Sequence, residues 1–245
     1  MAIQYKTRAF VFKKSDRNEA DQTFSVFTDE FGKVEIFAKA IRKINSKLRK
    51  DFNIFYFSDI EFIQGKNVKT IIDATRIKKF DEINLSAKKL KVANQIANIL
   101  SEFIKGQEKD KHLFDLIEDC FDQLNDKSIN IKNYQLAFQY FFWNFISLQG
   151  YKIEVDSCAL CRKELNPCDL YFSGKTGGVV CKNCSTSGVE QNGKQKINSD
   201  VVKILRLIFK KDWQTISKLK IEMCLEKEIE DISKDAFYAF CPTHS

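Results

Sequence analysis

The pattern of hydrophobic and polar positions changes near residue 80, from a period of two to a period of three to four. Before that point, residues 22–28 (QTFSVFT) and 33–38 (KVEIFA) alternate between apolar and polar side chains, which predicts strands with one buried face. The sequence DEFG between them has the chemistry of a hairpin turn. Further strands are predicted at 5–12, 52–63 and 68–72. So many short strands favour a small closed β-barrel, with the OB-fold as the leading candidate.

Helical periodicity dominates the chain after residue 80. Apolar residues recur three and four positions apart, as on a helix with one buried face. One segment, YQLAFQYFFWNFISL, is apolar nearly all round, which indicates a helix in the middle of a bundle. The predicted helices cover residues 85–104, 113–124 and 131–149, a segment that begins near 198, and two more at about 213–219 and 229–240.

Together these patterns predict an α+β protein. An OB-fold domain is expected at residues 1–80, followed by an α-helical bundle domain at residues 81–245. A cysteine-rich insert at about 156–187 interrupts the helical pattern and has the character of a zinc ribbon.

Two Cys-x-x-Cys pairs, Cys158/Cys161 and Cys181/Cys184, are separated by 19 residues. A gap of two residues lets one tight turn present both thiolates to the same ion, and four soft ligands suit a tetrahedral Zn²⁺. A thioredoxin-like redox pair would need a βαβ setting, which neither pair has. Because four cysteines leave zinc no open coordination position, we predict that this zinc is structural and not catalytic.

The remaining cysteines are interpreted differently. Cys120 and Cys224 fall on apolar helical positions and are expected in the core, and Cys168 is expected beside the zinc site. Cys241 begins a final Cys-Pro-Thr-His segment that imitates a metal-ligand pair but is interpreted as a frayed tail.

The chain has two histidines and none of the usual phosphate-loop, dinucleotide, hydrolase or zinc-protease motifs, so no enzyme is predicted.

The net charge of +7 lies entirely in the first third of the chain. Residues 1–80 contain 17 Lys and Arg against 10 Asp and Glu, whereas the rest of the chain contains 23 of each. Residues 39–50, KAIRKINSKLRK, contain six bases and no acid. Ile41, Ile44 and Leu48 keep helical spacing, so a short helix is expected to direct the bases outward. Such a field between strands of an OB barrel favours nucleic-acid binding over a merely solvated face.

Two groups of motifs together resemble those of a known family. Glu19-Ala20-Asp21 is followed by FTDEFGKVEIFAKAIRK, similar to a signature in which E-x-D precedes a T-x-x-x-G-K turn and an A-x-G-x-R-K run. CALC and YFSGKTGGVVCKNC are similar to the zinc module of the same proteins. The chain thus resembles the bacterial RecO family of DNA repair proteins. Ala40 stands where that family usually has glycine.

The resemblance implies a recombination mediator without enzymatic activity. Such a protein binds single- and double-stranded DNA, anneals strands coated by single-strand-binding protein, and works with RecR to load RecA. By position, the resemblance implies DNA binding by Lys33, Lys39, Arg42 and Lys43. Charge alone adds Lys47, Arg49 and Lys50. Some relatives lack the cysteines, which implies that zinc is not needed for the shared activity.

A zinc-ribbon adaptor that binds only protein partners is the main alternative to this function, and a zinc-dependent nucleic-acid enzyme is the second.

The first residues show no secretory signal, and no stretch approaches 18 apolar residues without charge. We therefore expect a cytoplasmic, nucleoid-associated protein with no membrane partner and no small-molecule substrate.

Overall fold

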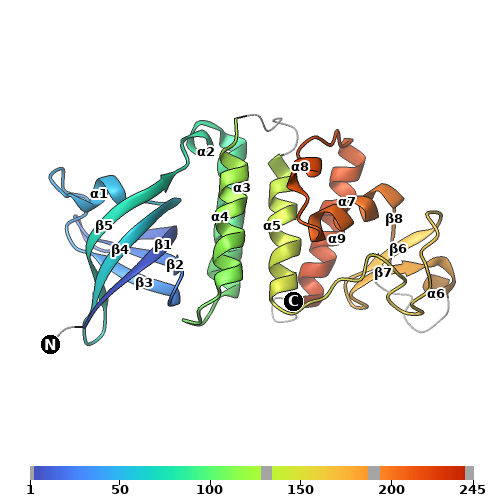
Figure 1. Cartoon of the computed structure of the whole chain (residues 1–245), viewed down its shortest axis with the longest axis horizontal. Helices are drawn as coiled ribbons and strands as arrows, with labels where there is room; N and C mark the ends of the chain where they lie inside the picture. Colours follow the sequence, from blue (N-terminus) through green and yellow to red (C-terminus); the bar gives the residue numbers. More distant parts are fainter. Residues whose placement is uncertain (1–2, 128–133, 187–193, 241–245) are drawn as a thin grey trace. The chain divides into compact units, whose positions relative to one another are not determined.

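The computed structural model of the 245-residue chain describes residues 3–127, 134–186 and 194–240 (Figure 1). The chain divides into two compact units, residues 1–127 and 128–245. The first contains a β-barrel and the helices that pack on it, and the second contains a helical bundle with a small three-stranded sheet. The predicted α+β class is therefore confirmed. Among the described residues, no helix combines the length and the apolar character that a bilayer crossing requires.

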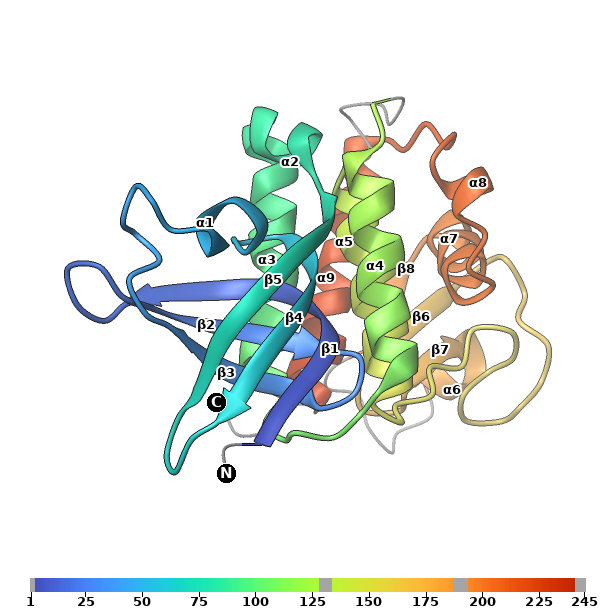
Figure 2. The same ribbon diagram turned by 60° about the vertical axis from the view of Figure 1, so that its left-hand side comes forward.

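The strands of the first unit wrap around a common interior (Figure 2). They close into a barrel in the order β1-β2-β3-β5-β4, which is an OB-like arrangement and confirms the predicted barrel. Most neighbours are antiparallel, but β3 and β5 close the barrel in parallel through the pairs Ile36 with Lys69 and Phe37 with Thr70. The strands are β1 (Ile3–Asp16), β2 (Gln22–Thr28), β3 (Gly32–Ala38), β4 (Tyr56–Gln64) and β5 (Lys69–Lys79).

The barrel interior is filled by alternate residues of the strands, as the period of two requires. On β3, for example, Val34 and Ile36 point inward and are fully buried, while Glu35 between them is exposed. Other strands contribute Val11, Phe24, Val26, Ile60, Phe62 and Ile71 to the same core.

Part of the outer barrel surface is also buried, because two of the helices that follow the strands, α3 (Ala87–Phe103) and α4 (Lys111–Asn125), cover it. Phe10 packs on Phe121 with ring centroids 4.6 Å apart, and Phe57 packs on Phe114 at 5.5 Å. Strand β1 therefore buries both of its faces between Ala9 and Phe12, which explains its imperfect alternation. The short helix α2 (Asp81–Leu85) precedes α3.

One predicted strand begins later than expected. The segment 52–63 was predicted as a continuous strand, but β4 begins at Tyr56, after the short helix α1 (Leu48–Asp51). Phe52 instead packs on Phe24 inside the barrel, and Phe55 adopts a left-handed backbone with φ of 61°. The predicted domain boundary near residue 80 follows the end of β5; that residues 1–80 form a domain of their own stays a prediction.

The second unit is built around a central helix, as the all-round apolar segment predicted. Helix α5 (Tyr134–Leu148) packs against α7 (Ser199–Phe209) and α9 (Met223–Phe240), with α8 (Trp213–Ile216) beside α7. Trp143 of α5 is fully buried among aromatic rings. One buried polar side chain of α5 bonds across to a neighbouring helix, because the Asn144 amide donates to the carbonyl of Ile208 at 3.2 Å.

The cysteine-rich insert forms a sheet with strand order β7-β6-β8. The backbone N–H of Gly174, just after β6, donates to the Asp235 carboxylate of α9 at 2.7 Å, which fastens the insert to the bundle. A Cβ at Gly174 would lie 2.6 Å from the Asp235 carbonyl oxygen, so this close approach requires glycine. The elements of the insert are β6 (Leu170–Ser173), β7 (Gly178–Cys181), α6 (Lys182–Thr186) and β8 (Gln195–Ile197).

Candidate metal centre and nucleic-acid interface

Residues 39–50, here called the basic loop, run through turns before entering α1. The expected helix through Ile41 and Leu48 is wrong, because α1 begins only at Leu48. Two contacts from the β1–β2 turn hold the loop in its non-helical path. The Asp21 carboxylate accepts a hydrogen bond from the N–H of Ala40 at 2.7 Å, and the N–H of Arg42 donates to the carbonyl of Ala20 at 3.0 Å.

Ala40 supplies the sharp bend at the start of the basic loop. Its φ of 54° lies in the left-handed region, which disfavours residues with a Cβ and is incompatible with continuing an α-helix. This is the position at which the signature quoted above has glycine, the residue that adopts this conformation without a Cβ penalty. Asp21 thus explains the E-x-D motif, because its carboxylate accepts the N–H that the bend exposes.

The apolar residues of the basic loop divide into two kinds. Ile41 is buried at the end of the barrel and Leu48 packs against the barrel core. Ile44, at the same helical spacing in the sequence, is 95% exposed. The sequence pattern therefore did not distinguish two anchoring side chains from one that lies in solvent.

The structure places six of the predicted DNA-binding side chains on one exposed segment. These are Lys39, Arg42, Lys43, Lys47, Arg49 and Lys50. The Arg42 guanidinium also pairs with the Asp16 carboxylate at 3.3 Å, which is a weak, solvent-screened contact. Lys33 lies apart from them on β3, where its Nζ donates to the Ser101 carbonyl at 2.6 Å and burial lowers its pKa.

A hollow of about 350 Å³ lies beside the basic loop. Its lining includes Arg42 and Arg49 together with Lys14 of β1, whose Nζ donates to the Asn53 side chain at 2.9 Å. Sequence reasoning missed Lys14, because only the barrel closure brings β1 against the loop. Three cationic groups around one concavity form a site that suits a phosphate group.

The Asp21 carboxylate remains ionised beside these cations. The backbone hydrogen bond from Ala40 is the main reason that its pKa is lowered, the Asn18 amide adds a second donor, and Lys39 and Lys43 act in the same direction. The loop is therefore held by a charged acceptor, which makes a stronger hydrogen bond than a neutral one.

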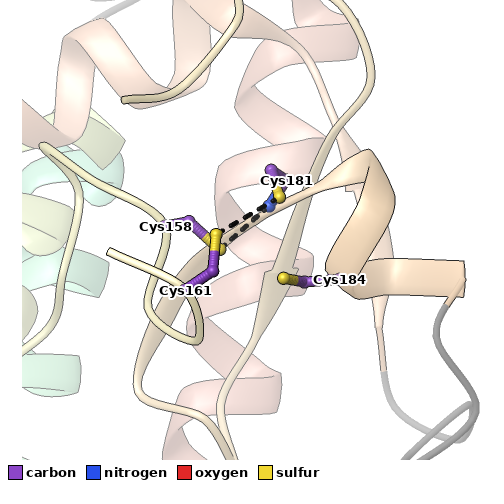
Figure 3. Close-up of side chains that lie close together, drawn as sticks. All are labelled: Cys158, Cys161, Cys181 and Cys184. Carbon is purple, nitrogen blue, oxygen red and sulfur yellow. Dashed lines mark hydrogen bonds between the residues drawn. The ribbon is translucent and has the colours of Figure 1, made fainter. Parts of the chain in front are cut away.

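The four cysteines of the two Cys-x-x-Cys pairs come together in the second unit, and their side chains point toward one another (Figure 3). Their sulfur atoms all lie within 4.8 Å of one another, and Cys161 and Cys181 are 3.8 Å apart. A tetrahedral Zn²⁺ with Zn–S bonds near 2.3 Å has sulfur atoms about 3.8 Å apart, so the donor set and its size fit this ion.

The electrostatics of the cluster favour a cation. Burial opposes ionisation of Cys158, but backbone N–H groups of Cys161, Cys181 and Leu160 stabilise its thiolate and bring its pKa down to about 6. Burial and hydrogen bonds from the neighbouring thiols raise the pKa of Cys184 to about 12. Cys158 therefore ionises readily and Cys184 resists ionisation, because thiolates at this spacing repel one another unless a metal ion compensates their charge.

The first pair is held by the loop that precedes it. The carboxylate of Glu154 accepts the N–H groups of Asp156 and Ser157 at 3.0 and 3.1 Å, and it also pairs with Arg162 at 3.1 Å. The hydrogen bond from Ser157 is the largest cause of its lowered pKa. The protein's own hydrogen bonds and this ion pair therefore contribute to the shape of the turn.

The other cysteines lie outside the cluster. Cys120 is fully buried in α4, as expected. Cys224 is exposed, so its predicted place in the core is wrong, because it lies in the first turn of α9 on a side that faces solvent. Cys168 is exposed and is not among the four clustered residues. Cys241 and the final Cys-Pro-Thr-His segment lie outside the described residues.

Family models match both parts of the chain. Residues 1–80 match the family described as "Recombination protein O N terminal", and residues 85–237 match "Recombination protein O C terminal". The first match contains the barrel and the basic loop, and the second contains the four-cysteine cluster.

Curated relatives align with nearly the whole chain. The "DNA repair protein RecO" of Dehalococcoides mccartyi is 30% identical over 226 residues, which cover 92% of this chain and 86% of the relative. The proteins of the same name from Caldanaerobacter subterraneus subsp. tengcongensis and Alkaliphilus metalliredigens are 27% and 24% identical. These alignments cover 93% and 94% of this chain, and 89% and 90% of the relatives.

Proposed function

The chain belongs to the RecO family of non-enzymatic recombination mediators, and from that membership we propose that it binds single- and double-stranded DNA through the basic loop. The observation that supports this most is the exposure of six cations on one loop of an OB-like barrel. OB barrels commonly bind oligonucleotides through such loops, and phosphate neutralisation releases counterions. We propose a secondary role in DNA binding for Lys33, because its Nζ already donates a hydrogen bond to a carbonyl oxygen.

We propose further that the bound strands are annealed and that, with RecR, RecA is loaded onto DNA coated by single-strand-binding protein in the bacterial cytoplasm. Annealing fits a basic surface because two polyanions approach more readily once their phosphate charges are neutralised. No covalent step is required of the protein.

The ion of the second unit is proposed to be Zn²⁺, held by Cys158, Cys161, Cys181 and Cys184. It supplies a structural cross-link between the loop of the first pair and the β7–α6 corner of the second. Four thiolate ligands complete its coordination shell, so the zinc-dependent enzyme is not favoured.

Salt dependence of DNA affinity tests the proposal. The logarithm of the association constant for single-stranded DNA should fall linearly with the logarithm of salt concentration, by roughly 0.7 for each phosphate neutralised. The double variant Arg42→Ala/Lys43→Ala should bind more weakly and flatten the slope by about 1.4, because two phosphate contacts are lost. Circular dichroism should show the same melting temperature.

The matched control is Lys88→Ala/Lys91→Ala, which removes the same charge from α3 in the same unit. Its affinity should change little. Equal losses in the two double variants would indicate a diffuse charge effect and would contradict a site on the basic loop. Binding that is absent or independent of salt would favour the adaptor that contacts only proteins.

A further inference from the structure

A second groove lies on the outer face of the barrel, and no residue of the basic loop lines it. It has a volume of about 470 Å³ and runs along β2 and β3, between the β4–β5 hairpin and the segment that joins α3 to α4. Because β3 alternates, Lys33, Glu35 and Phe37 all face outward into it. We call it the Phe37 groove.

Phe37 differs from most outward-facing phenylalanines of the barrel. Phe10, Phe27 and Phe57 are fully buried, since the rings of α4 cover them. Phe37 is only half-buried, and the group over its ring is the Arg17 guanidinium, 5.4 Å from the centroid. A large aromatic face that the protein's own core does not use is a surface on which another flat group can stack.

Cations lie along the same groove. They are Arg17 from the β1–β2 turn, Lys33 from β3, Lys69 from β5 and Lys105 from the α3–α4 segment, and Glu35 is the only acid among the described lining residues. Lys33 and Lys69 each donate to an oxygen atom already, at 2.6 and 3.4 Å, and both ammonium groups keep further donors. The aromatic ring therefore lies among positive charges.

We infer that the Phe37 groove binds single-stranded DNA, with one base stacked on the Phe37 ring and the flanking phosphates on Arg17 and Lys69. Aromatic platforms inside positively charged grooves bind single strands in this way, whereas a duplex keeps its base faces covered. The inference rests on the proposed DNA binding and adds to it a position at which one base stacks.

The position of β2 between the two concavities suggests a path for the bound DNA strand. Gln22 lines the hollow beside the basic loop, and its neighbour Thr23 lines the Phe37 groove. A single DNA strand bound at Phe37 therefore needs to cross only the end of β2 to reach Arg42. In this proposal the phosphates of one DNA strand contact both concavities, and one base stacks on Phe37.

The test compares two ligands and two variants. The ligands are an oligothymidylate of about 16 nucleotides and an abasic strand of equal length, which has the phosphates and lacks the bases. Phe37→Leu should weaken binding to the oligothymidylate about tenfold and leave binding to the abasic strand unchanged. The control is Tyr56→Leu, because Tyr56 is also half-buried and has an arginine, Arg76, over its ring at 5.7 Å.

Phe37→Trp gives a direct readout at the ring. Base stacking should quench the fluorescence of the new tryptophan when oligothymidylate is added, and the abasic strand should leave it unchanged. Equal affinity of Phe37→Leu and the native protein for oligothymidylate, with the Arg42/Lys43 variant still weakened, would overturn the stacking position alone. Salt-independent or absent binding by the native protein would overturn the proposed function as well.

Discussion

The carboxylate of Asp21 and the backbone N–H of Ala40 are joined by a 2.7 Å hydrogen bond that fixes the start of the basic loop. The two residues are side by side although the hairpin of β2 and β3 separates them in sequence. The position of the cations beyond Ala40 therefore depends on an acidic residue, which by charge alone would repel DNA.

Asp21→Ala should weaken binding to single-stranded DNA about fivefold, because the loop loses its charged acceptor and its cations lose their common orientation. Glu19→Ala removes the same charge from the same turn without breaking a contact to Ala40 and should bind slightly more tightly. Fluorescence anisotropy measures both. Changes of the same sign in the two variants would show that charge, and not loop geometry, decides the affinity.

Ala40→Gly should raise the free energy of unfolding by about 1 kcal/mol, since glycine adopts the left-handed conformation without a Cβ penalty. Ala38→Gly, two residues earlier, should lower it, because Ala38 is fully buried in a regular strand. Urea denaturation of both variants gives the comparison. A loss of stability in Ala40→Gly would refute the strained bend.

Glu118 of α4 should make the stability of the first unit depend on pH. Its carboxylate pairs with Arg8 at 3.0 Å and with Lys78 at 2.8 Å. Burial raises its pKa, but the hydrogen bonds and charges of these two partners outweigh burial and leave the pKa below its usual value of 4.5. A depressed folded-state pKa means that the stabilisation is complete above pH 4.5 and is lost as pH falls through the lower value.

Glu118→Gln should therefore cost about 1–2 kcal/mol at pH 7, and should reduce the loss of stability on acidification below pH 4.5. Thermal melts from pH 7 to pH 3 measure both effects. Asp122→Asn is the matched control, because Asp122 pairs with the same Lys78 at 2.6 Å but is more exposed. Parallel pH profiles for native protein and Glu118→Gln would argue against this ion pair as the source.

Cys181→Ser/Cys184→Ser should abolish metal binding, which elemental analysis of the purified protein measures as zinc per chain. Cys168→Ser should keep the metal, because this thiol is exposed and lies outside the cluster. Structural zinc is coupled to folding, so the double variant should lose order in the insert. Equal zinc content in the two variants, or none in the native protein, would refute the proposed ligand set.

Local sequence patterns were sufficient to predict the structure where the environment of each residue is set by its neighbours in sequence. The alternation of residues 33–38 predicted β3, because its inward side chains Val34 and Ile36 meet only the barrel interior. The spacing within each Cys-x-x-Cys pair predicted that its two sulfur atoms would face one ion, because a tight turn brings both to one side.

Long-range contacts determined the path of the basic loop and the lining of the two concavities, which the sequence did not predict. Helical spacing in the basic loop gave way to hydrogen bonds that the N–H groups of Ala40 and Arg42 donate to Asp21 and Ala20, which lie before β2. The sequence cannot show that Lys69 and Lys105 line the same groove as Phe37, because the barrel closure and the α3–α4 segment bring them there. Both concavities of the proposed DNA surface depend on residues that are distant in the chain.

The parallel seam between β3 and β5 has a dynamic consequence. It joins the strands through two residue pairs, whereas β4 and β5 pair along nearly their whole lengths. The amides of the seam should therefore exchange with deuterium faster than those between β4 and β5. Phe37 and Lys69 lie on opposite sides of this seam, so a DNA strand that contacts both fastens the barrel shut and slows exchange there.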